Sequence, residues 1–179
     1  MTLARPALVS EEEFLALPET TDRVELLDGE VVVAPSPSAW HQELLGRIGF
    51  ALRAWTLTVD QPAFVGIAPL DVRFAPSRIL QPDVFVIVDG IDLDGEVPID
   101  RVPELCVEVL SSNRAYDRIT KRFVYAAAGV QELWVVEPTG LVERWRGEGL
   151  AAAEELVESV STPLLPGFEL DLRELFRKR

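Results

Sequence analysis

The chain has 179 residues, of which 48% are hydrophobic, and it carries a formal net charge of −13 at pH 7. This length and composition are typical of one globular domain and exclude an intrinsically disordered chain. The negative charge argues against broad electrostatic binding of nucleic acid. No apolar run reaches the ~18–20 residues that cross a bilayer, and residues 1–14 lack the long apolar core of a secretory signal, so we expect a cytoplasmic protein.

The chain contains one cysteine, Cys106, and one histidine, His41. An intrachain disulfide, a cysteine-rich zinc site and a multi-histidine metal site are therefore all excluded. Any bound metal would be held mainly by carboxylates, which suits Mg²⁺, Mn²⁺ or Ca²⁺. Cys106 lies in an apolar run with no histidine nearby in the sequence, and we expect it to pack in the core.

The first third of the chain contains signals for two helices and a hairpin. Ser10, followed by three glutamates, has the pattern of a capping box and predicts a short helix. Two β-rich runs within residues 23–33 flank Asp28-Gly29, which is a strong hairpin signal. Residues 41–55 then predict an amphipathic helix, because apolar side chains recur at helical spacing. These side chains are Leu44, Leu45, Ile48, Leu52 and Trp55.

The rest of the chain predicts mainly strands, with one further long helix. We expect strands over residues 63–68, 70–74, 83–88, 103–111 and 132–138. A helix over 113–129 precedes the last of these, with Asn113 near its start and Gly129 as its stop. Residues 141–146 and the region 153–159 form an outer hairpin, unless the latter is helical, and a short helix closes the chain.

This order of elements predicts an α/β or α+β domain with a mixed central sheet. The chain has no internal repeat, no low-complexity tract and no linker long enough to divide it. We therefore expect a single domain over residues 1–179.

Two of the predicted strands each carry one acid in an apolar setting. Asp83 alternates with Phe85 on one face of its strand, and Glu108 shares a face with Cys106. If the two strands are neighbours, both carboxylates can point to the same side of the sheet. Close carboxylates repel one another, so one of them holds a proton unless a cation joins them. Mg²⁺, held by two carboxylates with water and a phosphate, is the simplest such partner.

Plainer interpretations of these acids stay open. Asp83 follows Pro82 at the start of a strand, where an exposed turn acid is ordinary. Glu108 lies deeper in its apolar run, and a buried pair with an arginine would also satisfy it. The spacing alone does not decide whether the two acids meet.

The predicted helix after Glu108 is rich in basic residues. At about 100° per residue, its apolar side chains form one face that we expect to pack on the core, namely Tyr116, Ile119, Phe123 and Ala127. The opposite face then carries Arg114, Asp117, Arg118, Lys121 and Tyr125. On this face, Lys121 could stabilise charge on a phosphate or orient an attacking water. The alternative is that Lys121 only pairs with Asp117 on a solvent-exposed helix, and such a pair contributes ~0.3–0.5 kcal/mol to stability.

The order Pro82-Asp83, then Glu108, then a basic helix resembles the PD-(D/E)-x-K nuclease superfamily. More closely, the chain is similar to the Uma family of restriction-endonuclease-like proteins over almost its full length. The similarity is carried by EEFLALPE, RVELLDGEVV, HQELL, PLDVRF, QPDVFVIVD, PELCVEVLSSNRAYDRITKRFVYAAAGVQELWVVEP and LLPGFELDLRELF, in this order.

The resemblance implies a restriction-endonuclease-like αβββαβ core with an extra N-terminal hairpin. The N-terminal helix and hairpin would occupy residues 1–40, the nuclease core 41–138, and the C-terminal strands and short helix 139–179. It also implies hydrolysis of phosphodiester bonds that depends on Mg²⁺ or Mn²⁺, with Asp83, Glu108 and the main-chain oxygen of Val109 as metal ligands.

One position departs from the superfamily pattern. The motif lysine stands two residues after the second acid, where this chain has Leu110. Relatives in the family supply the lysine from the following helix, which points here to Lys121. Glu25 and His41 also match family-typical positions and are further catalytic candidates. The plainer interpretations are that Glu25 is an ordinary strand acid and that His41 is a first-turn residue with local hydrogen bonds.

We expect the protein to act on nucleic acid, most simply DNA, as a metal-dependent endonuclease. A nuclease-fold module that binds or assembles without catalysis is the main alternative, favoured by the acidic charge and by Leu110 at the lysine position. A nuclease acting on RNA or short nucleotides is a third possibility, because it would need less positive charge. The resemblance is also compatible with a homodimer, in which two sites address two strands.

Overall fold

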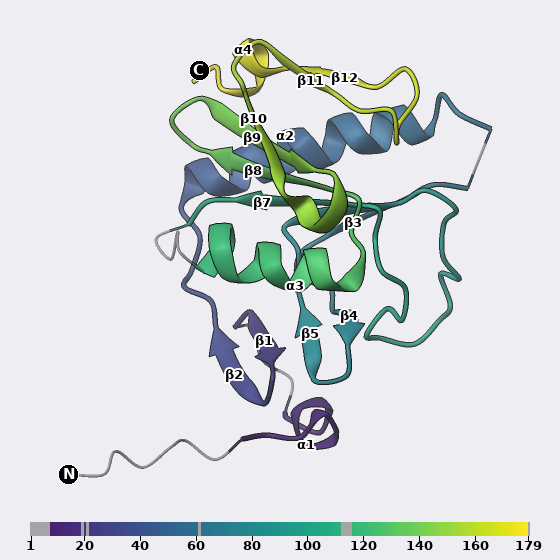
Figure 1. The fold of residues 1–179 in the computed structure, drawn as a ribbon, viewed down its shortest axis with the longest axis vertical. Helices are drawn as coiled ribbons and strands as arrows, with labels where there is room; N and C mark the ends of the chain where they lie inside the picture. The colour runs from purple at the N-terminus through teal and green to yellow at the C-terminus, as the bar shows by residue number, and fades with distance from the viewer. Residues whose placement is uncertain (1–7, 19, 21, 61, 112–115, 179) are drawn as a thin grey trace.

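The computed structural model describes residues 8–18, 20, 22–60, 62–111 and 116–178 (Figure 1). Its largest sheet has six strands: β3 (Phe64–Ile67), β6 (Val84–Ile87), β7 (Leu105–Val109), β8 (Glu132–Glu137), β9 (Leu141–Arg146) and β10 (Ala152–Leu156). Their order in space is β10-β9-β8-β7-β6-β3. Only β7 and β8 run parallel, so the central sheet is mixed, as the sequence predicts.

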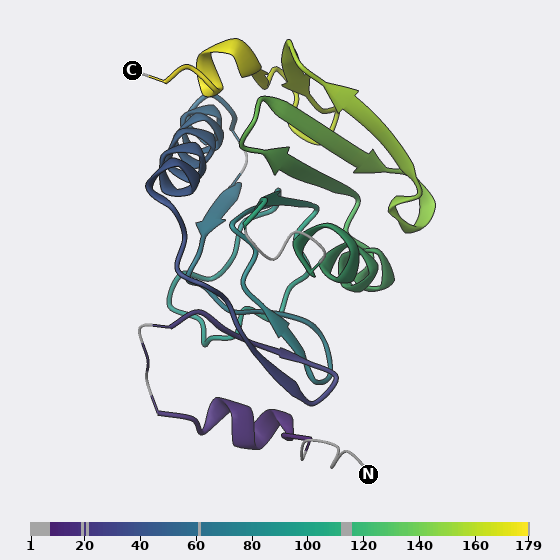
Figure 2. The same cartoon turned by 90° about the vertical axis from the view of Figure 1, so that its left-hand side faces the viewer.

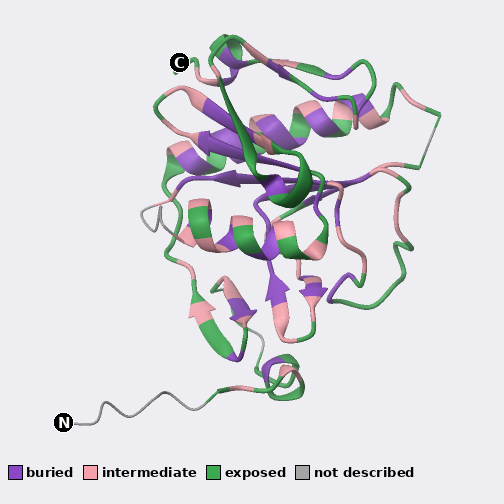
Figure 3. Cartoon of the chain, viewed as in Figure 1, coloured by how far each residue is buried: buried purple, intermediate pink, exposed green. Residues whose placement is uncertain are grey.

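Helices cover both faces of this sheet (Figure 2). α2 (Ala39–Thr56) packs on one face, and α3 (Lys121–Ala128), preceded by a π-helical turn η1 (Tyr116–Thr120), packs on the other. The crossover through α3 lets β7 and β8 run parallel. Because both faces are covered, all five residues of β7 are buried (Figure 3). Val107 belongs to the core on the α2 side, and Cys106 to the core on the α3 side.

The N-terminal hairpin belongs to a second, antiparallel sheet that lies below α3 in Figure 1. Its strands are β1 (Val24–Leu27), β2 (Glu30–Val33), β4 (Val72–Ala75) and β5 (Arg78–Leu80), in the order β2-β1-β5-β4. Asp28 and Gly29 have positive φ angles of 51° and 88°. Two such residues are typical of the tight hairpin turn that the sequence predicts.

A small core supports this sheet from the N-terminal side. α1 (Glu11–Leu15) begins with the capping box predicted for Ser10 and Glu13. It contributes Phe14, which packs with Leu26 of β1 and Ile79 of β5.

The C-terminal segment packs against the α2 side of the central sheet. After the 3₁₀ turn η2 (Glu148–Leu150) and β10, it forms a two-stranded sheet of β11 (Ser159–Ser161) and β12 (Glu169–Asp171), and then α4 (Leu172–Leu175). The ring of Phe168 stacks on Trp134 with centroids 5.9 Å apart. Among the described helices, none is long and apolar enough to cross a membrane.

The αβββαβ core is formed by α2, β3, β6, β7, α3 and β8. The predicted strand over 70–74 is β4, but it leaves the central sheet to pair with β5. The region 153–159 falls mostly in strand β10, which completes the outer hairpin with β9. Gly129 ends α3 in the left-handed conformation, as expected, whereas Asn113 lies outside the described residues.

The predicted orientation of the α3 helix is wrong. Ile119 and Phe123 are 51% and 62% exposed, whereas Lys121 and Tyr125 are fully buried. The physical reason is that Lys121 and Tyr125 have buried polar partners, so the helix turns this side toward the sheet.

Candidate active site

Asp83 and Glu108 lie beside each other at the junction of β6 and β7. The antiparallel register pairs Val84 with Val107, and one further step of the same register brings Asp83 opposite Glu108. Residues opposite one another in a sheet project to the same face. Asp83 Oδ2 accepts a 2.7 Å hydrogen bond from the backbone amide of Val109, so its carboxylate is fixed to the chain directly after Glu108. Both acids are 1% exposed, which rules out the exposed turn position for Asp83.

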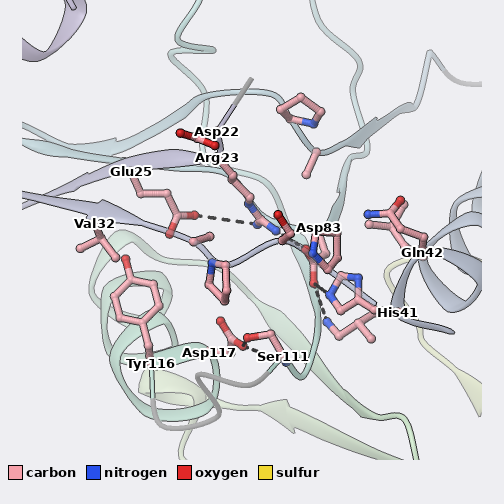
Figure 4. A pocket seen from close by; sticks show the side chains of 18 of the residues that line it. Asp22, Arg23, Glu25, Val32, His41, Gln42, Asp83, Ser111, Tyr116 and Asp117 are labelled. Carbon is pink, nitrogen blue, oxygen red and sulfur yellow. Dashed lines mark hydrogen bonds and ion pairs between the residues drawn. The ribbon is translucent and has the colours of Figure 1, made fainter. Parts of the chain in front are cut away.

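Asp83 is held by two cationic or potentially cationic side chains from distant parts of the chain. Arg23 Nη1 lies 2.5 Å from Oδ1, and His41 Nε2 lies 3.4 Å from Oδ2. Figure 4 shows these two side chains approaching the carboxylate from different directions. Burial alone would raise the pKa of Asp83, but the hydrogen bond from His41 and the charge of Arg23 outweigh it and lower the pKa to about 2. Asp83 is therefore ionised at neutral pH.

Glu108 has partners from α3 on the same side of the sheet. Lys121 Nζ lies 3.2 Å from each of its carboxylate oxygens, and the hydroxyl of Tyr125 donates to Oε1. Burial raises the pKa of Glu108 to about 8, with the charge of Lys121 opposing the shift and that of Asp83 adding to it. The environments of the two acids thus push their pKa values apart, as at sites where carboxyl groups have different tasks.

Lys121 connects the central sheet to the small sheet. Its Nζ also lies 2.9 Å from Glu25 Oε1, and that oxygen accepts the backbone amide of Gln81 at 2.8 Å. Burial would lower the pKa of Lys121, but the negative charges of Glu108 and Glu25 raise it, so the amine stays protonated. Lys121 is 2% exposed, and Asp117 instead accepts hydrogen bonds from Ser111. The solvent-exposed Asp117–Lys121 pair is thereby excluded.

A cavity of about 230 Å³ lies against this cluster. Its walls come from the N-terminal hairpin, the loop over residues 34–37, the start of α2, and the segment around η1 (Figure 4). Arg23, His41, Asp83 and Lys121 line it, whereas Glu108 lies behind Lys121 and does not. Among the described residues, His41 Nδ1 and Arg23 Nε are buried without a protein hydrogen-bond partner. Such atoms require water or a ligand, so the cavity is built for polar contents.

The five side chains singled out from the sequence therefore lie in one cluster: Glu25, His41, Asp83, Glu108 and Lys121. Glu25 is buried and paired with Lys121, unlike an ordinary strand acid. The backbone amide of His41 does bond locally, to Ser38 Oγ, while its ring reaches Asp83.

Sequence reasoning missed Arg23 and the role of Tyr125 as a hydrogen-bond donor to Glu108. Arg23 stands just before β1 with no local feature that separates it from other surface arginines. Tyr125 lies four residues after Lys121, on the side of the helix that the sequence assigned to solvent. A search for donors at i+4 from the lysine on that helix would have found it.

The fold belongs to the restriction-endonuclease-like class. It is similar to the crystal structure of a putative nuclease belonging to DUF820 from Anabaena variabilis, with a TM-score of 0.78 and 22% sequence identity. The match covers 94% of this chain and 97% of that one. Residues 11–173 match the model of the Uma2 family, which is described as a putative restriction endonuclease, and the chain therefore belongs to this family. Among curated proteins, no sequence matches the chain.

Proposed function

We propose that this protein is an endonuclease that hydrolyses phosphodiester bonds, most simply in DNA, and depends on Mg²⁺ or Mn²⁺. The observation that carries the proposal is the lysine contact: Lys121 Nζ, from a helix, lies 3.2 Å from Glu108, next to the strand end that fixes Asp83. Two acids and one lysine are the residue types of the superfamily motif. In this chain the lysine stands on α3 and not two residues after Glu108, as it does in the motif. The contact of Lys121 with Glu108 supports the role assigned to this lysine.

The donor chemistry of the cluster fits a hard divalent cation. Asp83, Glu108 and the main-chain oxygen of Val109 would hold the ion, and all three offer the oxygen ligands that Mg²⁺ prefers. In the described part of the chain, no group of three or more histidine, cysteine, aspartate or glutamate residues is arranged so that it could hold a metal ion. Mg²⁺ does not need one, because it commonly takes one or two carboxylates with water and substrate phosphate.

The charges of the cluster also leave a place for a cation. Glu25, Asp83 and Glu108 carry three negative charges when all are ionised, against the two positive charges of Arg23 and Lys121. A proton on Glu108 balances this excess, in keeping with its raised pKa. A bound divalent ion would take over that role, and when bound it polarises a phosphate and lowers the pKa of a coordinated water.

The remaining residues of the cluster hold these groups in place. Lys121 presents a permanent positive charge at the cavity wall, where it stabilises negative charge that develops on a phosphate. Glu25 positions that amine, since it contacts Lys121 Nζ at 2.9 Å from strand β1. Tyr125 orients Glu108, and His41 together with the Val109 amide orients Asp83.

The test is nicking of supercoiled plasmid by the purified protein with Mg²⁺ or Mn²⁺. We expect cleavage that EDTA abolishes and that Glu108→Gln reduces by at least ~10³-fold, in line with loss of an essential catalytic group. Glu132→Gln is a matched control, because Glu132 is also a buried strand acid but bonds Trp134 and Thr162 away from the cavity. Cleavage that persists in Glu108→Gln would assign the activity to another site.

A non-enzymatic binding module remains the second candidate, and one observation favours it. Asp83 and Glu108 already have cationic partners within the protein, Arg23 and Lys121, so the fold does not require a metal. Calorimetric titration with Mn²⁺ separates the candidates. A site-specific binding signal that Asp83→Asn abolishes supports the nuclease, whereas no binding at millimolar Mn²⁺ supports the binding module.

The same assay extends to RNA and short nucleotides, for which the small cavity and the net charge of −13 are the supporting observations. A panel of duplex DNA, single-stranded DNA, RNA and dinucleotides distinguishes these substrates by their relative cleavage rates. We also propose a homodimer that brings two sites to two strands, which sedimentation velocity tests directly.

A further inference from the structure

Arg23 is the side chain of the cluster for which the proposed chemistry gives no task. It lines the cavity, and its side chain is 23% exposed, whereas that of Asp83 is 2% exposed. Nη1 contacts Asp83 Oδ1, and Nη2 donates to the main-chain oxygen of Gln81. Its Nε is buried without a protein partner. Nη2 also lies 3.9 Å from Glu25 Oε1. Arg23 thus contacts the candidate ligand Asp83 at one end and lines the cavity.

Both oxygens of Asp83 are occupied in this structure. Oδ1 contacts Arg23, while Oδ2 accepts from the Val109 amide and contacts His41. A carboxylate offers about four lone-pair sites, and these contacts take up most of those on Asp83, so a cation that reaches Asp83 competes with its present partners. The Val109 amide is part of strand β7 and cannot move alone, and His41 is held at the start of the long helix α2.

Arg23 is the partner that can leave. It stands before the first residue of β1, outside the regular part of the strand, and it borders the cavity into which its side chain can swing. The guanidinium of Arg23 is also positively charged, and a divalent cation bound to Asp83 would repel it, because like charges a few Å apart repel one another strongly in a partly buried site. Neither feature applies to the Val109 amide. His41 also lines the cavity, but it lies within the regular part of α2, whereas Arg23 lies outside β1.

We propose that Arg23 is an exchangeable countercation for Asp83. In the metal-free protein it neutralises the buried carboxylate, and it moves off Oδ1 into the cavity when a divalent cation binds. The inference rests on the proposed function, because it takes Asp83 as a metal ligand. Its consequence is that Arg23 stabilises the empty site and at the same time weakens metal binding.

Calorimetry with Mn²⁺ tests this directly. We expect Arg23→Gln to bind Mn²⁺ about tenfold more tightly than the wild type, or better, because one competing charge is gone. Arg23→Lys keeps a competing positive charge beside Asp83, so its affinity for Mn²⁺ should stay within about threefold of that of the wild type. Arg78→Gln is the matched control: Arg78 also pairs with an aspartate on the small sheet, Asp28, but away from the cavity, and its loss should leave Mn²⁺ binding unchanged.

A purely structural role gives a different result. Arg23→Gln would then lower the melting temperature of the metal-free protein without strengthening Mn²⁺ binding, and that outcome overturns the inference. If the wild type binds Mn²⁺ and Arg23→Gln binds it equally, only the role of Arg23 is lost and the proposed function stands. If neither protein binds Mn²⁺, both fail. Binding by Arg23→Gln alone supports the inference, since the arginine then blocks the site.

A measurement on the wild type covers the case in which Arg23→Gln does not fold. The guanidinium resonances of Arg23, assigned by their absence in Arg23→Lys, can be followed by NMR during titration with Mg²⁺, which is diamagnetic. We expect them to shift and to exchange faster with water as Arg23 leaves Asp83. Arg23 resonances that stay unchanged while Mg²⁺ shifts the amide signal of Val109 would overturn the proposed displacement of Arg23 from Asp83.

Discussion

Lys121 Nζ lies 2.9 Å from Glu25 Oε1, and this contact joins the crossover helix of the central sheet to the N-terminal hairpin. The same amine contacts Glu108 on β7. A buried ammonium needs such partners, because removing an ion from water costs several kcal/mol unless other charges and hydrogen bonds offset it. The small sheet therefore completes the candidate site and contributes to its stability as well as to its walls.

Glu25→Gln tests this contribution. The change leaves Lys121 with Glu108 as its only described carboxylate partner, so we expect the free energy of unfolding in urea to fall by ~2–3 kcal/mol, somewhat below the ~3–5 kcal/mol for a fully broken buried pair. Glu30→Gln, on the exposed strand of the same hairpin, should change it by less than ~0.5 kcal/mol. Equal effects of the two changes would contradict the importance of the buried contact.

The pair of Lys121 and Glu108 should be coupled energetically. Lys121→Met removes the cationic partner of Glu108, and Glu108→Gln removes one of the two carboxylate partners of Lys121, whereas the double variant removes both groups. We expect the loss in free energy of unfolding of the double variant to be smaller than the sum of the two single losses by ~1–3 kcal/mol, as for residues in one buried network. Urea denaturation of the four proteins measures this difference, and additive effects would show that the 3.2 Å contact carries no coupling.

The raised pKa of Glu108 makes stability depend on pH. Its value is about 8 in the folded chain, against an ordinary value of 4.5. The folded state therefore binds the proton more tightly than the unfolded state, and this contribution is complete below pH 4.5 and lost as pH rises through about 8. In EDTA, we expect the free energy of unfolding to fall by ~2–4 kcal/mol between these values. Glu108→Gln should remove most of this decrease. A wild type with the same free energy of unfolding at pH 4.5 and pH 8 would contradict the raised pKa of Glu108.

Two glycines provide a test of the packing that is independent of the site. A Cβ on Gly66 in β3 would lie 2.1 Å from Cζ of Phe85, whereas a Cβ on Gly46 in α2 would meet nothing within 4 Å. We expect Gly66→Ala to destabilise the protein by ~1–3 kcal/mol, because the ring must move within a packed core. Gly46→Ala should stabilise it by ~0.5–1 kcal/mol through helix propensity. Thermal unfolding of both variants checks the opposite signs.

Local signals predicted much of the fold. The cap at Ser10, the turn at Asp28-Gly29 and the stop at Gly129 depend on residues next to one another in the chain, and all three are confirmed. The period-two alternation in β6 and β7 allowed Asp83 and Glu108 to share a face if the two strands were neighbours, and the structure pairs these strands. The strands β5, β11 and β12 were missed, because three residues are too few to show a periodic pattern.

Contacts between distant polar groups were not predictable in the same way. Arg23 and Asp83 are 60 positions apart, and nothing in the composition around either residue indicates the other. The orientation of α3 failed for a related reason. Assigning apolar residues to the core is sound for most helices, but here Lys121 and Tyr125 are buried by polar partners on β7 and β1 that the helix sequence does not contain.

The most direct test of a shared cation is a crystal structure of the protein soaked with Mn²⁺, with anomalous diffraction to locate the ion. We expect one strong peak within coordination distance of carboxylate oxygens of both Asp83 and Glu108, with the Arg23 guanidinium no longer on Asp83 Oδ1. A map with no peak at this position, and Arg23 still bound to Asp83 at saturating Mn²⁺, would contradict the metal-dependent nuclease.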